Sequence, residues 1–317
     1  MKIIVAFDGT APSEAAINAL QDMQWAQDTE VKIISVLRTE DHALPFLSKG
    51  SSQVSQEHIA AAVKALKEKS AALEKAMKGC TINFEVLQGD AKNKIVEAAK
   101  LWGANVIFIG QRGIHGVERM LLGSVSQGVL LQSPCPVVIV KSDPDKAASC
   151  HAFKKILIAV DNSAYSKEAT KWIKKLNWAA DAEFKLVTVV APLIDQVESL
   201  QDASRVEALG LEHEALIGAA KKELESEAAD LRTQLTNSKI SCGVGQGDPR
   251  EVILQAAFAM QADLIVMGSH GRTGLEKLLI GSVSQAIASQ AECSVAVVRG
   301  LVPKGTGKMQ LSGRFEI

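Results

Sequence analysis

The chain has 317 residues, with 35 basic and 36 acidic side chains, 47% hydrophobic residues and 4% aromatic residues. This length suits two domains of about 150 residues each, and the apolar content excludes an intrinsically disordered chain. Because the charges balance and no basic tract stands out, electrostatic binding to nucleic acid is excluded as the main role.

The sequence carries no sign of export or of membrane insertion. Its first residues, MKIIVAFDG, form too short an apolar run for a secretion signal, and no segment approaches the roughly 18–20 apolar residues of a membrane span. The cysteines are odd in number and scattered without a C-x-x-C pair, which favours free thiols over a disulfide or zinc framework. These observations predict a cytoplasmic protein.

Apolar runs and helical patterns alternate along the first part of the chain. Continuous apolar runs predict strands at KIIVAF, VKIISVL, INFEVL, NVIFI and PVVIV, in that order. Helices are expected between them, from near Ser13, from about Ser55 to Met77, after an Asp90 N-cap and from Ser124. Strands that alternate with helices predict parallel βαβ units and a doubly wound, Rossmann-like α/β fold with a five-stranded parallel sheet.

The same segments recur later in the chain. KIIVAFDGTAPS returns as KILIAVDNSAYS, and QGDAKNKIVEAA returns as QGDPREVILQAA. Asp8 and Asp161 are 153 positions apart (161 − 8), whereas Gly110 and Gly268 are 158 apart (268 − 110). The second copy therefore has about five extra residues, which we place in the connection 191–210, where insertion costs little.

A repeat of this length indicates one domain used twice, since solenoid repeats are only about 20–50 residues long. We expect domains at residues 1–141 and 153–300, a linker at 142–152 and a tail at 301–317. In the second domain, residues 212–235 predict a long charged helix with an apolar stripe.

Each copy contains a glycine loop between an apolar run and a helix start. Both loops fit the pattern G-x2-G-x9-G-S, which is carried by Gly110, Gly113, Gly123 and Ser124 and by Gly268, Gly271, Gly281 and Ser282. Such a loop leaves backbone N–H groups open, has no Cβ to block an approach, and adds the helix dipole. The pattern therefore predicts two phosphate-binding sites at the carboxyl edge of the sheets, where Asp8 and Asp161 also fall.

These residues resemble the universal stress protein family, in its tandem form with two domains in one chain. The resemblance covers residues 1–141 and 153–300 and rests on the two loops, on the aspartates after the first strands, and on Val36, Val189 and Cys135-Pro136-Val137. It implies an adenine-nucleotide alpha-hydrolase-like fold and ATP binding, with ADP or AMP as alternatives. It also implies an internal pseudo-dimer joined through the last strands, with further homodimer formation as an open alternative.

The resemblance also implies a role for each site residue. The loop glycines would close on ribose and phosphates, and Ser124 and Ser282 would offer a hydroxyl and an N–H to a phosphate. The next N–H groups would come from Val125, Ser126, Val283 and Ser284. Asp8 and Asp161 would lie near the base and ribose, and the adenine slot would be lined by Val36, Ile109, Val189 and Met267. Mg²⁺ or Mn²⁺ would be held mainly by the phosphates.

Each of these roles has a structural alternative. The glycines are also typical of turns, and Asp8 and Asp161 could cap the following helices. We expect His115 and His270 to be exposed loop residues rather than catalysts, and Trp25 and Trp178 to be packing residues.

Together these patterns predict a nucleotide-dependent sensor or regulator of a stress response, with an unidentified protein partner. No carboxylate–histidine set repeats in both copies, so slow ATP hydrolysis is the most catalysis we expect. A nucleotidyl-transfer enzyme would show an S-G-G-x-D-S loop or an H-I-G-H motif, and the chain has neither. The remaining alternative is a scaffold or carrier for a hydrophobic metabolite or a partner protein.

Overall fold

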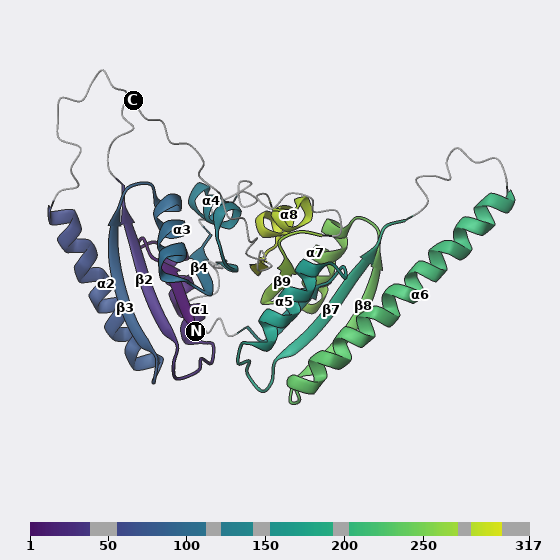
Figure 1. Cartoon of the computed structure of the whole chain (residues 1–317), viewed down its shortest axis with the longest axis horizontal. Coiled ribbons are helices and arrows are strands. Elements are labelled where there is room, and N and C mark those ends of the chain that lie inside the picture. The colour runs from purple at the N-terminus through teal and green to yellow at the C-terminus, as the bar shows by residue number, and fades with distance from the viewer. Residues whose placement is uncertain (39–55, 112–121, 142–152, 193–202, 272–279, 300–317) are drawn as a thin grey trace, which may run out of the picture.

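The computed structural model describes residues 1–38, 56–111, 122–141, 153–192, 203–271 and 280–299. We call residues 1–141 the first half and residues 153–299 the second half. Within these described segments each half alternates strands and helices, and the two halves lie side by side (Figure 1).

The first half contains nine elements in the order that the sequence predicts. They are β1 (Lys2–Ala6), α1 (Ala11–Gln21), β2 (Glu30–Leu37), α2 (Gln56–Ala76), β3 (Thr81–Gln88), α3 (Ala91–Trp102), β4 (Val106–Gly110), α4 (Ser124–Gln132) and β5 (Val137–Val140). Helix α1 begins two residues before the expected Ser13, because Pro12 is well suited to the first turn of a helix. Asp90 caps α3 as predicted, since its side chain accepts a hydrogen bond from the Asn93 N–H.

The second half repeats this order. Its elements are β6 (Lys155–Ala159), α5 (Ala164–Lys174), β7 (Glu183–Val190), α6 (Ala203–Gln234), β8 (Lys239–Gln246), α7 (Pro249–Met260), β9 (Leu264–Gly268), α8 (Ser282–Gln290) and β10 (Ser294–Val298). Helix α6 has 32 residues, whereas its counterpart α2 has 21 as described. The expected charged helix therefore begins earlier than residue 212, and part of the connection 191–210 is helical.

The ten described strands form one continuous sheet with the order β3-β2-β1-β4-β5-β10-β9-β6-β7-β8. Among the described strands, pairing is parallel within each half and antiparallel only between β5 and β10, where Ile139 lies opposite Val295. This arrangement confirms the two doubly wound parallel sheets and the internal pseudo-dimer through the last strands. We call the β5–β10 pairing the seam.

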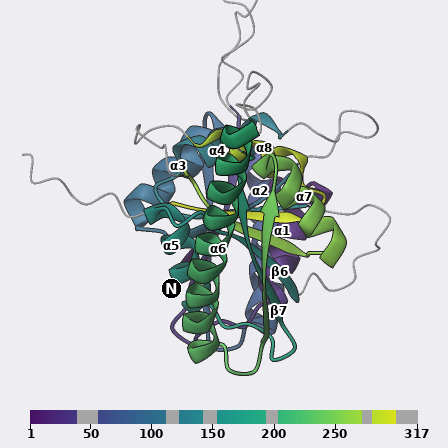
Figure 2. The same cartoon turned by 90° about the vertical axis from the view of Figure 1, so that its right-hand side faces the viewer.

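The strands are buried on both faces, as their continuous apolar runs predict. Ile3 and Val5 of β1 belong to one core cluster, which packs against α1, α2, α5 and α6. Ile4 and Ala6 belong to the other, which packs against α3, α4, α7 and α8. Each cluster contains residues of both halves, so the core is continuous across the seam. Helices α2 and α6 lie on opposite outer flanks of the molecule (Figures 1 and 2).

The two matching tryptophans pack inside the fold, which confirms their predicted structural role. Trp25 meets Phe108 edge to face at 6.1 Å, and Trp178 meets Phe184 in the same way at 5.5 Å. Each indole N–H donates to a carbonyl five residues earlier, at distances of 2.8 and 2.9 Å. These paired contacts fix the ends of α1 and α5, next to a bridge that links the halves at positions 24 and 177.

We predict that Phe184→Ala lowers the free energy of unfolding by about 3–5 kcal/mol, because the ring is 0% exposed and its removal leaves a cavity. Phe258→Ala is the matched control, since that ring is 76% exposed, and its cost should stay within about 0.5 kcal/mol. Urea unfolding followed by circular dichroism measures both. Equal losses for the two variants would contradict this account of the core.

Candidate functional site

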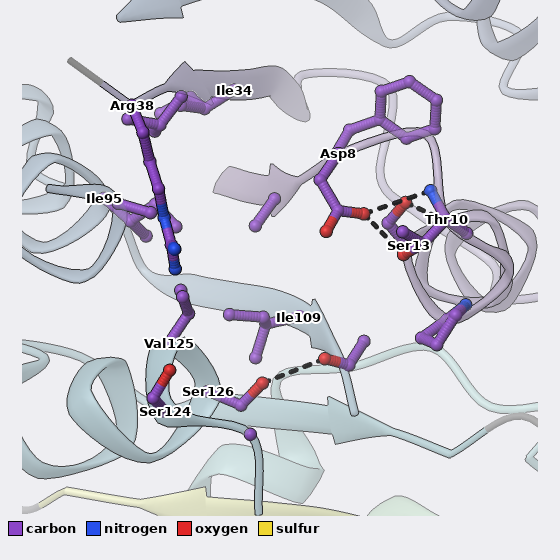
Figure 3. Close-up of a pocket in the computed structure, with 17 residues that line it drawn as sticks. Asp8, Thr10, Ser13, Ile34, Arg38, Ile95, Ile109, Ser124, Val125 and Ser126 are labelled. Atoms are coloured by element: carbon purple, nitrogen blue, oxygen red, sulfur yellow. Dashed lines mark hydrogen bonds between the residues drawn. The ribbon is translucent and has the colours of Figure 1, made fainter. Parts of the chain in front are cut away.

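A cavity of about 350 Å³ lies at the carboxyl ends of β1, β2 and β4 (Figure 3). Strand β1 pairs with β2 on one side and with β4 on the other, so this is where the strand order reverses and where doubly wound sheets bind ligands. Its volume falls within the range of small-molecule sites. The lining combines apolar and polar side chains, namely Ile34, Val36, Ile95, Ile109 and Val125 with Asp8, Thr10, Ser13, Arg38, Ser124 and Ser126.

Asp8 follows β1 directly and borders the cavity, but it also holds the turn into α1. Its Oδ1 accepts a hydrogen bond from the Thr10 N–H at 3.1 Å and another from the Thr10 hydroxyl at 2.5 Å. In the second half, Oδ1 of Asp161 accepts from the Ser163 N–H at 3.0 Å. Thr10 and Ser163 occupy the N-cap positions, so the alternative that the aspartates themselves cap the helices is wrong.

The turn after each aspartate requires a left-handed residue. Gly9 has φ of 77°, and Asn162 at the matching position has φ of 61°. Asparagine tolerates this conformation better than most residues with a side chain. Both halves therefore present the aspartate in the same turn geometry, although the sequences DGT and DNS differ.

The first turns of α4 and α8 have backbone N–H groups available at the site. Their N-caps are Gly123 and Gly281, and no described side chain caps either helix. The hydroxyl of Ser126 donates to the Gly110 carbonyl at 2.9 Å, and Ser284 donates to the Gly268 carbonyl at 2.8 Å. These bonds fasten each helix start to the end of the preceding strand and leave the first-turn N–H groups to a ligand.

The first glycine of each loop is required by packing within the fold. A Cβ on Gly110 would lie 2.1 Å from the Pro12 carbonyl oxygen, and one on Gly268 would lie 2.7 Å from the Tyr165 carbonyl carbon. The starts of α1 and α5 therefore pass directly over β4 and β9. This packing role differs from both the ligand role and the turn role that the sequence predicts for these two positions.

The structure describes some of the later loop glycines but not all of them. Gly113, His115 and the rest of residues 112–121 lie outside the described residues. Gly271 is described, and a Cβ there would lie 2.8 Å from Oδ2 of Asp161. The Gly281 N–H donates to the Ser269 carbonyl at 2.7 Å, so the two ends of the second loop close on one another.

The other predicted residues of the second half lie at positions equivalent to those around the cavity. Val189 is in β7, Met267 is the fourth residue of β9, and Ser282, Val283 and Ser284 open α8. The matched positions differ most in chemistry where Tyr165 stands in place of Pro12 and Ala191 in place of Arg38.

Arg38 is a lining residue that sequence reasoning missed. It follows the end of β2, and Figure 3 shows its side chain extending across the cavity towards Val125. The signal available in the sequence was a basic residue directly after a strand that ends at the ligand edge. Because its counterpart is Ala191, this cation is a property of the first half.

His270 is buried, so the expectation of an exposed loop histidine is wrong. Its residue is 8% exposed, its ring lies 4.8 Å from that of Tyr165, and Nδ1 lies 3.1 Å from the Ser269 hydroxyl. Burial lowers the pKa of His270 below its usual value, and the nearby Arg299 charge lowers it further. The imidazole is therefore neutral at pH 7, and among the described residues Nε2 has no hydrogen-bond partner.

A metal site built by the protein itself is not found among the described residues, where no group of three or more His, Cys, Asp or Glu could hold an ion. No described helix is long and apolar enough to cross a membrane. The described cysteines, Cys80, Cys135, Cys242 and Cys293, are free thiols, as their spacing predicts.

The fold and the site define a tandem α/β protein with a small-molecule cavity at the switch point of its sheet. The Universal stress protein family matches the chain twice, over residues 1–141 and 152–299. The chain therefore belongs to the universal stress protein family.

Some relatives match nearly the whole chain, and others match only about half of it. A universal stress protein of Mycolicibacterium smegmatis is 26% identical over 300 residues, which cover 94% of this chain and 96% of the relative. One of Methanocaldococcus jannaschii is 32% identical over 149 residues, covering 46% of this chain and 82% of the relative. The crystal structure of a universal stress protein from Archaeoglobus fulgidus, 22% identical, has the same fold with a TM-score of 0.61 and covers 94% of this chain and 98% of its own.

We predict that Gly110→Ala lowers the free energy of unfolding by about 1–3 kcal/mol, because the added methyl overlaps the backbone at Pro12. Gly218→Ala is the matched control: it lies in α6 with nothing within 4 Å of an added Cβ, and it should raise the free energy of unfolding by about 0.5–1 kcal/mol. Urea denaturation measures both. If Gly110→Ala were as stable as the wild type, the packing role of this glycine would be refuted.

Proposed function

We propose that the chain binds an adenine nucleotide, with ATP as the main candidate, and acts as a stress-response sensor or regulator. The observation that supports this most directly is the first-half cavity, which joins an apolar slot to a helix start that no described side chain caps. A purine needs the first feature and phosphates need the second. The duplicated glycine pattern extends the proposal to the second half.

In the proposed pose the base lies against Val36 and Ile109, and the ribose lies near Asp8. The phosphates meet the N–H groups of Ser124, Val125 and Ser126, with Gly113 and Gly123 in the loop that closes on them. The equivalent second-half residues are Asp161, Val189, Met267, Gly271, Gly281, Ser282, Val283 and Ser284. Mg²⁺ or Mn²⁺ would accompany the phosphates as their counterion.

On this proposal, nucleotide binding changes the surface that contacts a regulatory partner in the cytoplasm, or a second copy in a homodimer. On this proposal residues 1–141 and 153–300 act as two domains joined by 142–152. Slow ATP hydrolysis is the second candidate activity, because positioned phosphates with a metal give some rate. A scaffold or carrier for a hydrophobic metabolite or partner is the alternative if no nucleotide binds.

The direct test is a titration of the whole chain with Mg-ATP by isothermal calorimetry, with Ser124→Asp and Ser282→Asp. A carboxylate at either helix start repels the phosphates, so each variant should lose one of two sites and the double variant both. Ser226→Asp, on the exposed face of α6, adds the same charge elsewhere and should leave binding unchanged. Absence of binding by the wild type at millimolar Mg-ATP would reject the nucleotide proposal and favour the scaffold.

Arg38 gives a second prediction. In the Ser282→Asp background, Arg38→Met should weaken Mg-ATP binding by about 10- to 100-fold, which is the loss of one charge-assisted hydrogen bond to a phosphate. Arg232→Met in α6 is the control for removing an arginine away from the cavity, and it should leave the affinity within about twofold. An unchanged affinity in Arg38→Met would place this side chain outside the nucleotide site.

A further inference from the structure

Two cations cross the seam at matching positions. Lys141 follows β5 and Arg299 follows β10, and they are 158 positions apart (299 − 141), the same offset as the two glycine loops. Because β5 and β10 are antiparallel, the end of each strand lies beside the start of the other. Helix α4 ends just before β5 begins, and α8 ends just before β10 begins. Each cation therefore lies at the last turn of a helix in the opposite half.

Arg299 of the second half reaches α4 of the first. Its guanidinium donates to the carbonyl oxygens of Leu130 at 3.0 Å and Leu131 at 2.5 Å. These carbonyls belong to the last turn of α4, and Ser124 opens the same helix at the cavity.

Lys141 of the first half reaches the end of α8 in the second. Its Nζ donates to the carbonyl oxygen of Ser289 at 3.3 Å and to that of Ala291, while its backbone N–H donates to the Ser294 hydroxyl at 3.2 Å. Burial lowers the pKa of Lys141 from its usual value to about 8, against the opposing effects of Cys293 and Glu292. The ammonium is thus largely withdrawn from water at the seam.

The last carbonyls of a helix lack intrahelical partners and carry its negative dipole end, so a cation there stabilises the helix. Helices α4 and α8 have only nine residues each and so span about 13–14 Å. In such a short helix the last turn is close to the first. A contact at the carboxyl end therefore constrains the N–H groups at the other end.

Arg299 also lies beside the glycine loop of its own half. The residue before it, Val298, accepts a hydrogen bond from the Ser269 N–H at 2.8 Å, and burial and the Arg299 charge both lower the pKa of His270, which packs against Tyr165. The loop end continues to Gly271, next to Asp161. A single side chain thus touches the helix of one site and borders the loop of the other.

We propose that Arg299 and Lys141 are positioning residues that hold the phosphate-facing helix of the opposite half and so couple the occupancy of the two sites. The proposal rests on the nucleotide sites proposed above. A ligand that fixes α4 also fixes Arg299 and the loop beside it, so binding at one site favours binding at the other. By linkage the effect is reciprocal.

The test measures each site separately across the seam. In the Ser282→Asp chain, where only the first-half site remains, Arg299→Met should weaken Mg-ATP binding about three- to tenfold. In the Ser124→Asp chain, Lys141→Met should weaken the second-half site by a similar factor. Arg299→Lys and Lys141→Arg are the rescue controls. Each keeps a cation at the position, and each introduces the residue that the other half has at the matching position.

A loss of first-half affinity in Arg299→Met that Arg299→Lys restores would support the proposal, and unchanged affinity would overturn it. Amide hydrogen exchange without nucleotide provides an independent readout. Arg299→Met should accelerate exchange over α4 and leave α3 of the same half unchanged. If no ATP binds while exchange over α4 still accelerates, the nucleotide proposal fails and the positioning role stands. Unchanged exchange would overturn the positioning role.

Discussion

The antiparallel pairing of β5 with β10 is the interaction on which the rest of the structure depends. It joins two parallel sheets into one of ten strands and lets both core clusters run through the whole molecule. It also sets the directions of α4 and α8, since each leads into one of the paired strands. The geometry of both candidate sites therefore follows from a few residues, such as Val138 and Ala296, which lie opposite each other at the seam.

The sequence was sufficient to predict the fold because its signals are local or repeated. Continuous runs such as KIIVAF are buried on both faces, and Asp90 caps its helix through neighbouring residues. The position of the site followed from which residues come directly after strands. Burial of His270, the reach of Arg38 and the contact of Arg299 with Leu130 could not be predicted, because they depend on which distant elements become neighbours.

The two halves share a framework but differ in part of the site lining. The Asp8 and Asp161 turns, the Ser126 and Ser284 hydroxyl bonds and the glycines that pass under α1 and α5 are common to both. Arg38 has no basic counterpart, and the Tyr165–His270 pair occupies a region where the first half has Pro12. The shared contacts are hydrogen bonds from side chain to backbone and close backbone packing, whereas the differences are in side chains such as Arg38 that only one half has at the site. Common architecture with different recognition is the expected result when a fold is kept and its site diverges.

Placing both halves in one chain changes the thermodynamics of the seam. Two separate subunits would meet only above a threshold concentration, whereas tethered partners see an effective concentration on the order of millimolar at any dilution. The seam is then free of the symmetry that identical subunits impose, because a substitution on one side is no longer repeated on the other. Lysine can therefore cross in one direction and arginine in the other. With both last strands already paired, the sheet edges that the described strands leave open are β3 and β8.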